Sequence, residues 1–145
     1  MTTGLFTTGG ERAFLWSSSS GMQDLGDLPG GGDLSTAYDV NDAGQVVGVG
    51  NVATGSRAFL WNSILGMVDL NTLIDPSTFV MQEARGISDT GMIAGYGVDS
   101  LTGATRGFLL TLNAPPPGVP APGALALLGL GLLGLGARRR LCRAA

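Results

Sequence analysis

The chain repeats itself, and this repetition limits the folds that it can adopt more than any other feature of the sequence. The segment Glu11–Trp16 (Glu-Arg-Ala-Phe-Leu-Trp) returns 45 residues later at Ser56–Trp61. A weaker copy follows after another 49 residues at Thr105–Leu110. Such self-similarity is typical of proteins built from copies of one small unit, each packed against its neighbours. The sequence therefore predicts a repeat region over residues 1–112.

Two further segments recur in the same order. Gly21–Leu25 matches Gly66–Leu70, again at an offset of 45 residues, and residues 37–48 match residues 84–95. Because three blocks recur in one order, chance similarity does not explain them. The chain holds about two and a half units.

Each block has the pattern of a short strand, rich in large apolar residues and bounded by Gly, Ser or Thr. Residues 16–22 and 61–67 are expected to link antiparallel strands. Asn41–Gly44 fits a tight hairpin turn that ends on Gly44 in the left-handed region, and Ser88–Gly91 repeats it. We therefore predict an all-β fold of repeated four-stranded antiparallel units, partly like a β-propeller, because one unit has the size of a propeller blade.

Two and a half units leave open sheet edges, which invite pairing with other chains. Residues 1–10 also lack the charged and apolar regions of a secretory signal peptide. We expect that the chain is a fragment of a longer protein or starts at an internal Met. The alternatives are an open stack of sheets and assembly with copies of itself.

The repeated segments resemble the extracellular HAF repeat family over residues 11–110. That family takes its name from a His-Ala-Phe tripeptide, and Arg12, Arg57 and Arg106 occupy the His position here. The resemblance implies export to the surface and repetition. It implies no defined chemistry.

The C-terminal region changes character. Residues 113–118 form a Pro-rich linker, Ala124–Ala137 is an uncharged run of Leu, Gly and Ala, and Arg138, Arg139 and Arg140 follow it. As a helix, the fourteen-residue run would measure about 21 Å at 1.5 Å per residue, less than the roughly 30 Å hydrocarbon core of a bilayer. A start at Val119 supplies enough length. Residues 119–145 therefore predict one hydrophobic helix whose arginines stay in the cytoplasm.

This tail resembles the PEP-CTERM sorting tail, in which a Val-Pro-Glu-Pro motif precedes an apolar span and an Arg cluster. The sorting motif falls on Val119, Pro120, Ala121 and Pro122, with Ala121 in the place of the Glu. The resemblance implies anchoring in the inner membrane, cleavage by an exosortase-like enzyme, and release to the cell surface or beyond. A plain tail anchor and a buried apolar hairpin are the alternatives.

The residue types of the chain argue against an enzyme, and its charge argues against nucleic-acid binding. The chain has no His. The residues up to Gly123 carry four Arg and all eleven acidic residues, which gives a net charge of about −7. This negative charge repels the phosphates of nucleic acids. The recurring Asp24 and Asp69, and Asp42 and Asp89, indicate turn or capping roles. We expect no catalytic residue, cofactor or metal.

The turns at residues 41–42 and 88–89 offer oxygen ligands for calcium but lack an Asp-x-Asp-x-Asp loop. Cys142 is interpreted as an unpaired thiol near the membrane, with lipidation as the alternative.

These features predict an exported, non-enzymatic protein associated with the cell surface or the extracellular matrix. Its expected partners are the membrane, an exosortase-like enzyme, and exopolysaccharide or other surface proteins. The alternative is a fragment of an extracellular β-propeller that binds or hydrolyses glycans.

Overall fold

The computed structural model describes residues 2–7 and 10–112. These residues form antiparallel β-strands and one short 3-10 helix, so the prediction of an all-β fold is confirmed. The elements are β1 (Thr2–Thr7), β2 (Glu11–Ser17), β3 (Gly21–Asp24), β4 (Ser35–Val40), β5 (Val46–Val52), β6 (Gly55–Asn62), β7 (Gly66–Asp69), η1 (Leu70–Leu73), β8 (Phe79–Ile87), β9 (Met92–Asp99) and β10 (Thr105–Thr111). Contacts divide the chain into two units, Met1–Thr111 and Leu112–Ala145.

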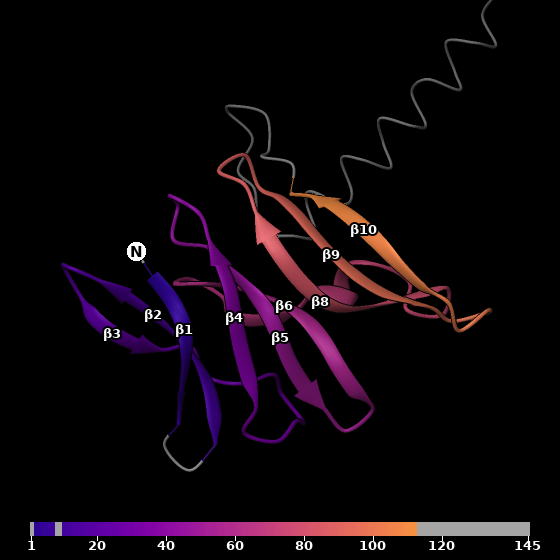
Figure 1. Ribbon diagram of the computed structural model, residues 1–145, viewed down its shortest axis with the longest axis horizontal. Helices are drawn as coiled ribbons and strands as arrows, with labels where there is room; N and C mark the ends of the chain where they lie inside the picture. Colours follow the sequence, from indigo (N-terminus) through magenta and orange to yellow (C-terminus); the bar gives the residue numbers. More distant parts are fainter. Residues whose placement is uncertain (1, 8–9, 113–145) are drawn as a thin grey trace, which may run out of the picture. The chain divides into compact units, whose positions relative to one another are not determined.

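The strands form three sheets, each a simple antiparallel meander (Figure 1). The first sheet has the order β1-β2-β3, the middle sheet β4-β5-β6-β7, and the third sheet β10-β9-β8. Within the described residues only the middle sheet has the four predicted strands, and the other two have three each.

Segments with matching sequences hold matching places in the sheets. The phenylalanines of β2, β6 and β10 each lie opposite a glycine in the preceding strand, and the pairs are Phe14 with Gly4, Phe59 with Gly48, and Phe108 with Gly95. A Cβ on Gly48 would lie 1.9 Å from the Thr36 carbonyl oxygen and 2.8 Å from the Phe59 ring. Glycine is therefore required there by close packing of the ring over the neighbouring strand.

The two predicted hairpin turns are confirmed. Gly44 has a φ of 75° and its N–H donates to the Asn41 carbonyl over 3.0 Å. Gly91 has a φ of 81° and donates to the Ser88 carbonyl over the same distance. Glycine suits both positions because a side chain disfavours positive φ.

The first and middle sheets share one hydrophobic core. Ala13 and Leu15 of β2 lie in the same cluster as Phe59 and Trp61 of β6. The cluster is completed by Leu25, Leu28, Ala37 and Val46. Burial of these side chains is the main force holding the two sheets together.

Polar contacts join the middle sheet to the third. The Ile87 N–H donates to Asp39 Oδ2 over 2.9 Å, and the Asp42 N–H donates to Asp89 Oδ1 over 2.8 Å. The guanidinium carbon of Arg85 lies 4.3 Å from the centre of the Tyr38 ring, a favourable cation–π distance. Corresponding turns of the two sheets therefore meet directly.

Within residues 2–7 and 10–112, the structure contains no helix with the length and apolar character needed to cross a bilayer. The hydrophobic helix predicted for residues 119–145 lies outside the described residues.

Candidate functional site

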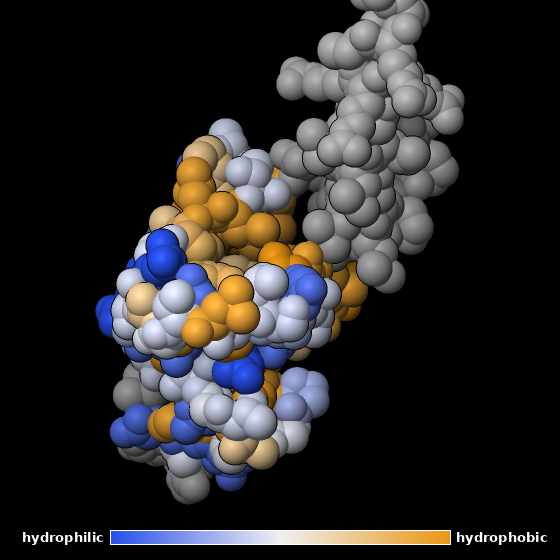
Figure 2. Space-filling model, turned by 90° about the vertical axis from the view of Figure 1, so that its right-hand side faces the viewer, coloured by the Kyte–Doolittle hydropathy of each residue, from blue (hydrophilic) through white to orange (hydrophobic). Residues whose placement is uncertain are grey.

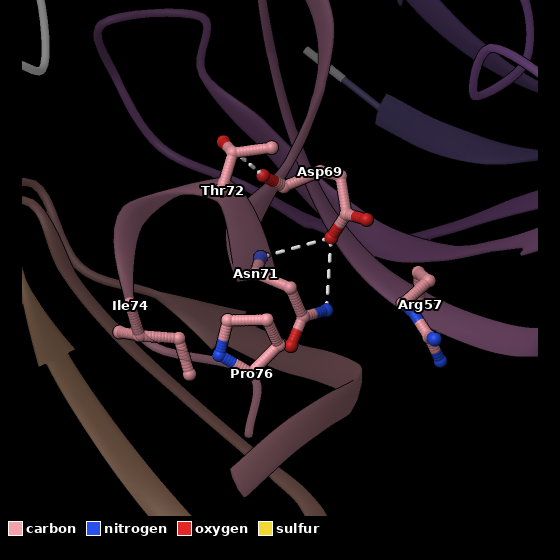
Figure 3. Close-up of a pocket in the computed structure, with 6 residues that line it drawn as sticks. All are labelled: Arg57, Asp69, Asn71, Thr72, Ile74 and Pro76. Carbon is pink, nitrogen blue, oxygen red and sulfur yellow. Dashed lines mark hydrogen bonds between the residues drawn. The ribbon is translucent and has the colours of Figure 1, made fainter. Parts of the chain in front are cut away.

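An open hollow lies beside the middle sheet. It has a volume of about 400 Å³ and is lined by Arg57, Asp69, Asn71, Thr72, Ile74 and Pro76 (Figure 3). Arg57 comes from β6, Asp69 ends β7, and the other four residues belong to η1 and the segment that follows it. The site is thus built where the chain leaves the middle sheet for the third.

Asp69 starts η1 and fixes the shape of this wall. Its Oδ1 accepts hydrogen bonds from the backbone N–H and the side-chain amide of Asn71, each at 2.8 Å. The Thr72 hydroxyl donates to the Asp69 carbonyl over 2.7 Å. A capping Asp is favoured here because its carboxylate satisfies an N–H that the helix leaves unpaired. The predicted turn or capping role of Asp69 is confirmed.

Asn71 also ties the site to the third sheet. Its Oδ1 accepts from the Met81 N–H over 2.7 Å, and its Nδ2 donates to the Met81 carbonyl over 2.8 Å. Both contacts are buried. The Asn71 side chain thus gives the Met81 backbone the two hydrogen bonds that a neighbouring strand would otherwise provide. These bonds leave Asn71 committed to structure.

Arg57 and Asp69 remain the polar groups that face the open space. Arg57 donates to the Ser56 carbonyl over 3.0 Å and to Thr54 Oγ1 over 2.8 Å, and it forms no ion pair with a described residue. Asp69 Oδ2 accepts no hydrogen bond from the described part of the chain. A guanidinium and a carboxylate in an open hollow can hydrogen-bond to the hydroxyl groups of a polar ligand.

In the first sheet, ion pairs occupy the position that corresponds to this hollow. Arg12, which corresponds to Arg57, lies 2.9 Å from Asp33, 3.4 Å from Asp24 and 3.4 Å from Asp27. Hydrogen bonds to Asp33 and then to Asp24 raise the pKa of the Arg12 guanidinium above its ordinary value. The Gly26 N–H donates to Asp24 Oδ1 over 2.8 Å, which confirms the predicted turn role of Asp24.

The hollow supplies few of the groups that catalysis needs. Asp69 is the only carboxylate among its six lining residues, whereas acid–base hydrolysis of glycosides uses two. The Thr72 hydroxyl, the one hydroxyl in the lining, donates its hydrogen bond to the Asp69 carbonyl oxygen and not to a general base.

The turns considered for calcium bond internally. Asn41 Oδ1 accepts from the Gln45 N–H over 3.0 Å, and Ser88 Oγ accepts from the Met92 N–H over 3.0 Å. Asp89 Oδ1 is taken by the Asp42 N–H. In the part of the chain that the structure describes, no three His, Cys, Asp or Glu residues gather as metal ligands would.

The predicted sorting residues lie outside the described residues. They are Val119, Pro120, Ala121, Pro122, Arg138, Arg139 and Arg140, and the same holds for Cys142. The hollow itself was missed from the sequence. Its only local signal was the recurring Asp69, because Arg57 on β6 and Met81, which holds Asn71, reach the site only through folding.

Comparison with known proteins identifies the tail. The family model of the PEP-CTERM protein-sorting motif matches residues 118–140. The match contains all four residues of the predicted sorting motif and the three consecutive arginines, and it confirms a PEP-CTERM sorting motif at this end of the chain. No curated protein and no solved structure matches the chain. The resemblance of residues 11–110 to HAF repeats stays a prediction.

Proposed function

We propose that this chain is an exported, non-enzymatic protein of the cell surface or extracellular matrix, sorted and processed through its C-terminal tail. The observation that carries the proposal is the match of residues 118–140 to the PEP-CTERM motif. Proteins with this motif are processed by exosortase-type enzymes, so the expected processing partner is an enzyme of that class.

The order of residue types in the tail supports a membrane-bound intermediate. Arginines after an apolar segment remain on the cytoplasmic side because their transfer across the bilayer is costly. Residues 1–112 would then stand on the outer side. Cleavage near Val119–Pro122 would free them from the membrane.

The body supports a binding or structural role. Its matching strand registers favour a repeated, propeller-like unit of the HAF type. Such a unit presents several similar surfaces to a matrix polymer or to other surface proteins. No paired carboxylates line the hollow at Asp69, which supports a role without catalysis.

The proposal is tested by moving the tail. Residues 113–145 are fused to a secreted reporter enzyme in a host that carries an exosortase, and reporter activity is followed in the inner membrane, at the surface and in the medium. We expect delivery to the surface or medium only when the exosortase is present. Equal distribution with and without the enzyme would refute the proposal.

A matched control isolates the sorting residues. In the fusion, Pro120→Ala and Pro122→Ala together alter the predicted motif, whereas Pro115→Ala and Pro116→Ala alter the linker, which lies outside the matched residues 118–140. We expect the first pair to hold the reporter in the membrane and the second pair to have little effect. Equal effects would assign the signal to general stiffness of the Pro-rich segment.

The hollow favours a second candidate, glycan binding. The half-buried Arg57 and Asp69 line the hollow with a guanidinium and a carboxylate, groups that can hydrogen-bond to sugar hydroxyls. Calorimetric titration of soluble exopolysaccharide fragments is expected to show binding that Asp69→Ala removes. Asp24→Ala is the matched control, because the same position in the first sheet is closed by Arg12. No heat from any fragment would reject this candidate.

A further inference from the structure

Each sheet has two chemically different faces, set by the alternation of side chains along the strands β2, β6 and β10. We call one the aromatic face, which carries the Phe and the residue two positions after it. In β6 these are Phe59 and Trp61. The other is the Ala-Leu face, which in β6 carries Ala58 and Leu60. Matching residues in β2 and β10 define the same two faces there.

Unlike faces meet inside the molecule. The Ala-Leu face of the first sheet, Ala13 and Leu15, packs with the aromatic face of the middle sheet, Phe59 and Trp61, in one buried cluster. The Ala-Leu face of the middle sheet is buried too, and β8 of the third sheet contacts both β5 and β6. At both interfaces the Ala-Leu face of one sheet is buried against the next sheet along the chain. The rule is that this face packs on the aromatic face of its neighbour.

The third sheet obeys this rule by burying its aromatic face. Ile93 and Ala84 on that face are fully buried, and Phe108 and Leu110 are half-buried. On the opposite face, Met92 and Ala94 of β9 and Leu109 of β10 are exposed, whereas Tyr96 and Val98 of β9 are half-buried. The Ala-Leu face of the third sheet is thus uncovered.

The two ends of the stack expose faces that are buried in the middle. Trp16 of the first sheet is 43% exposed and its neighbour Met22 is 60% exposed, whereas the corresponding Trp61 is 5% exposed. Leu109 of the third sheet is 64% exposed, whereas the corresponding Leu60 is 8% exposed. Figure 2, seen from the side of the β8–β10 sheet, shows hydrophobic patches within the polar surface.

We propose that a second copy of this chain covers these faces, with the Ala-Leu face at Leu109 of one copy packed on the aromatic face at Trp16 of the next. The internal contact of Leu15 with the cluster around Trp61 is the same contact between the same residue types. The residues of β10 that share the orientation of Leu109 are uncharged, namely Thr105, Gly107 and Thr111. The apolar part of this face is formed by Met92, Ala94 and Leu109, which are exposed. A small uncharged patch of this kind suits contact with another sheet better than contact with a charged ligand.

The two contacting faces differ, so the association is head to tail. Such a heterologous interface closes into a ring when the rotation between copies allows it and otherwise grows as a stack. Two copies already bring six sheets together, which is within the range that closed β-propellers use. The inference does not depend on export or on cleavage of the tail.

Complementing variants test this arrangement. The full chain is purified in a mild nonionic detergent, and its mass in solution is measured by sedimentation over a range of concentrations. Trp16→Glu and Leu109→Glu are each expected to weaken association at least about tenfold, as truncation of a central contact does. An equimolar mixture of the two variants is expected to form a 1:1 complex, because each retains the face that the other lacks.

Three results would overturn the inference. They are a wild-type chain that stays monomeric, variants that associate as the wild type does, and a mixture that forms no complex. If association runs through the tail, each variant alone will associate as the wild type does, which is the second of these results. Ile64→Glu, at an exposed apolar residue of the β6–β7 loop, is the matched control and should leave association unchanged. If Trp16→Glu lowers the unfolding temperature, Met22→Glu on the same face takes its place.

Discussion

The body and the tail of this chain encode their roles in different ways. In residues 10–112, Phe59 is fully buried and its ring packs over Gly48 of the neighbouring strand, so its effect depends on three-dimensional packing. In residues 118–140, the match to a sorting motif rests on the linear order of prolines, apolar residues and arginines. The comparison teaches that changes in the body should alter stability, whereas changes in the tail should alter sorting.

The largest effect is expected from the tail. Simultaneous Arg138→Gln, Arg139→Gln and Arg140→Gln removes the charges that we propose hold the C-terminal end in the cytoplasm. We expect the processed fraction, measured by immunoblot in an exosortase-carrying host, to fall at least about tenfold. The free energy of unfolding of the body should change by less than about 0.5 kcal/mol.

Arg143→Gln is the matched control for this change, because it lies just outside the matched residues 118–140. We expect nearly normal processing. A loss equal to that of the triple variant would show that total tail charge acts, and not the matched segment.

In the body, the largest effect is expected at the core. Phe59→Ala removes a fully buried ring and should lower the free energy of unfolding by about 3–5 kcal/mol. Leu109→Ala, at an exposed position of β10, should cost less than about 0.5 kcal/mol in dilute protein. Urea denaturation followed by circular dichroism measures both. Similar losses in the two variants would contradict the assignment of the core.

The link between the middle and third sheets should give an intermediate effect. Asn71→Ala leaves the buried N–H and carbonyl of Met81 without their partner, at a cost of about 2 kcal/mol or more. Asn62→Ala removes acceptors for two exposed N–H groups and should cost about 1 kcal/mol or less, since water replaces them. If the two substitutions have equal effects on urea denaturation, Asn71 is not a joint between the sheets.

The smallest effect is expected in the pH dependence of thermal stability. We assign this dependence to the body, because the tail contains no acidic residue. Hydrogen bonds from the backbone N–H groups of Leu101 and Thr102 lower the pKa of Asp99 below its ordinary value of 3.8. Because the folded pKa is the lower one, the stabilisation is present above about pH 4 and is lost as the pH falls through the folded pKa. Asp99→Asn should reduce the difference in thermal stability between pH 6 and pH 3. An unchanged difference would contradict this role.

The strands and tight turns could be predicted because their causes are local. Gly44 and Gly91 supply positive φ in turns that the neighbouring Asn41 and Ser88 close. Apolar runs bounded by Gly and Ser marked β2 and β6 equally well. The short helix η1 was not predicted, because Asn71 within it is held by Met81, which lies ten residues further along the chain and reaches Asn71 only in the fold.

The packing of the sheets was also beyond the sequence. The alternation in β2, β6 and β10 is the same, yet both faces of β6 are buried, whereas one face is exposed along β10 and at Trp16 of β2. Exposure depends on how many sheets lie on either side, which a single strand does not encode. The hollow at Arg57 was missed for the same reason, since the matching Arg12 is closed by residues from a later loop.

The most direct test of the account is the intact mass of the mature protein. The chain is produced behind a cleavable secretion signal in hosts with and without an exosortase, and its C-terminus is read by mass spectrometry of the intact product. We predict a product shorter than the 14.7 kDa chain, cut near Val119–Pro122, only when the exosortase is present. A product that keeps Arg138–Ala145 in both hosts would contradict the account.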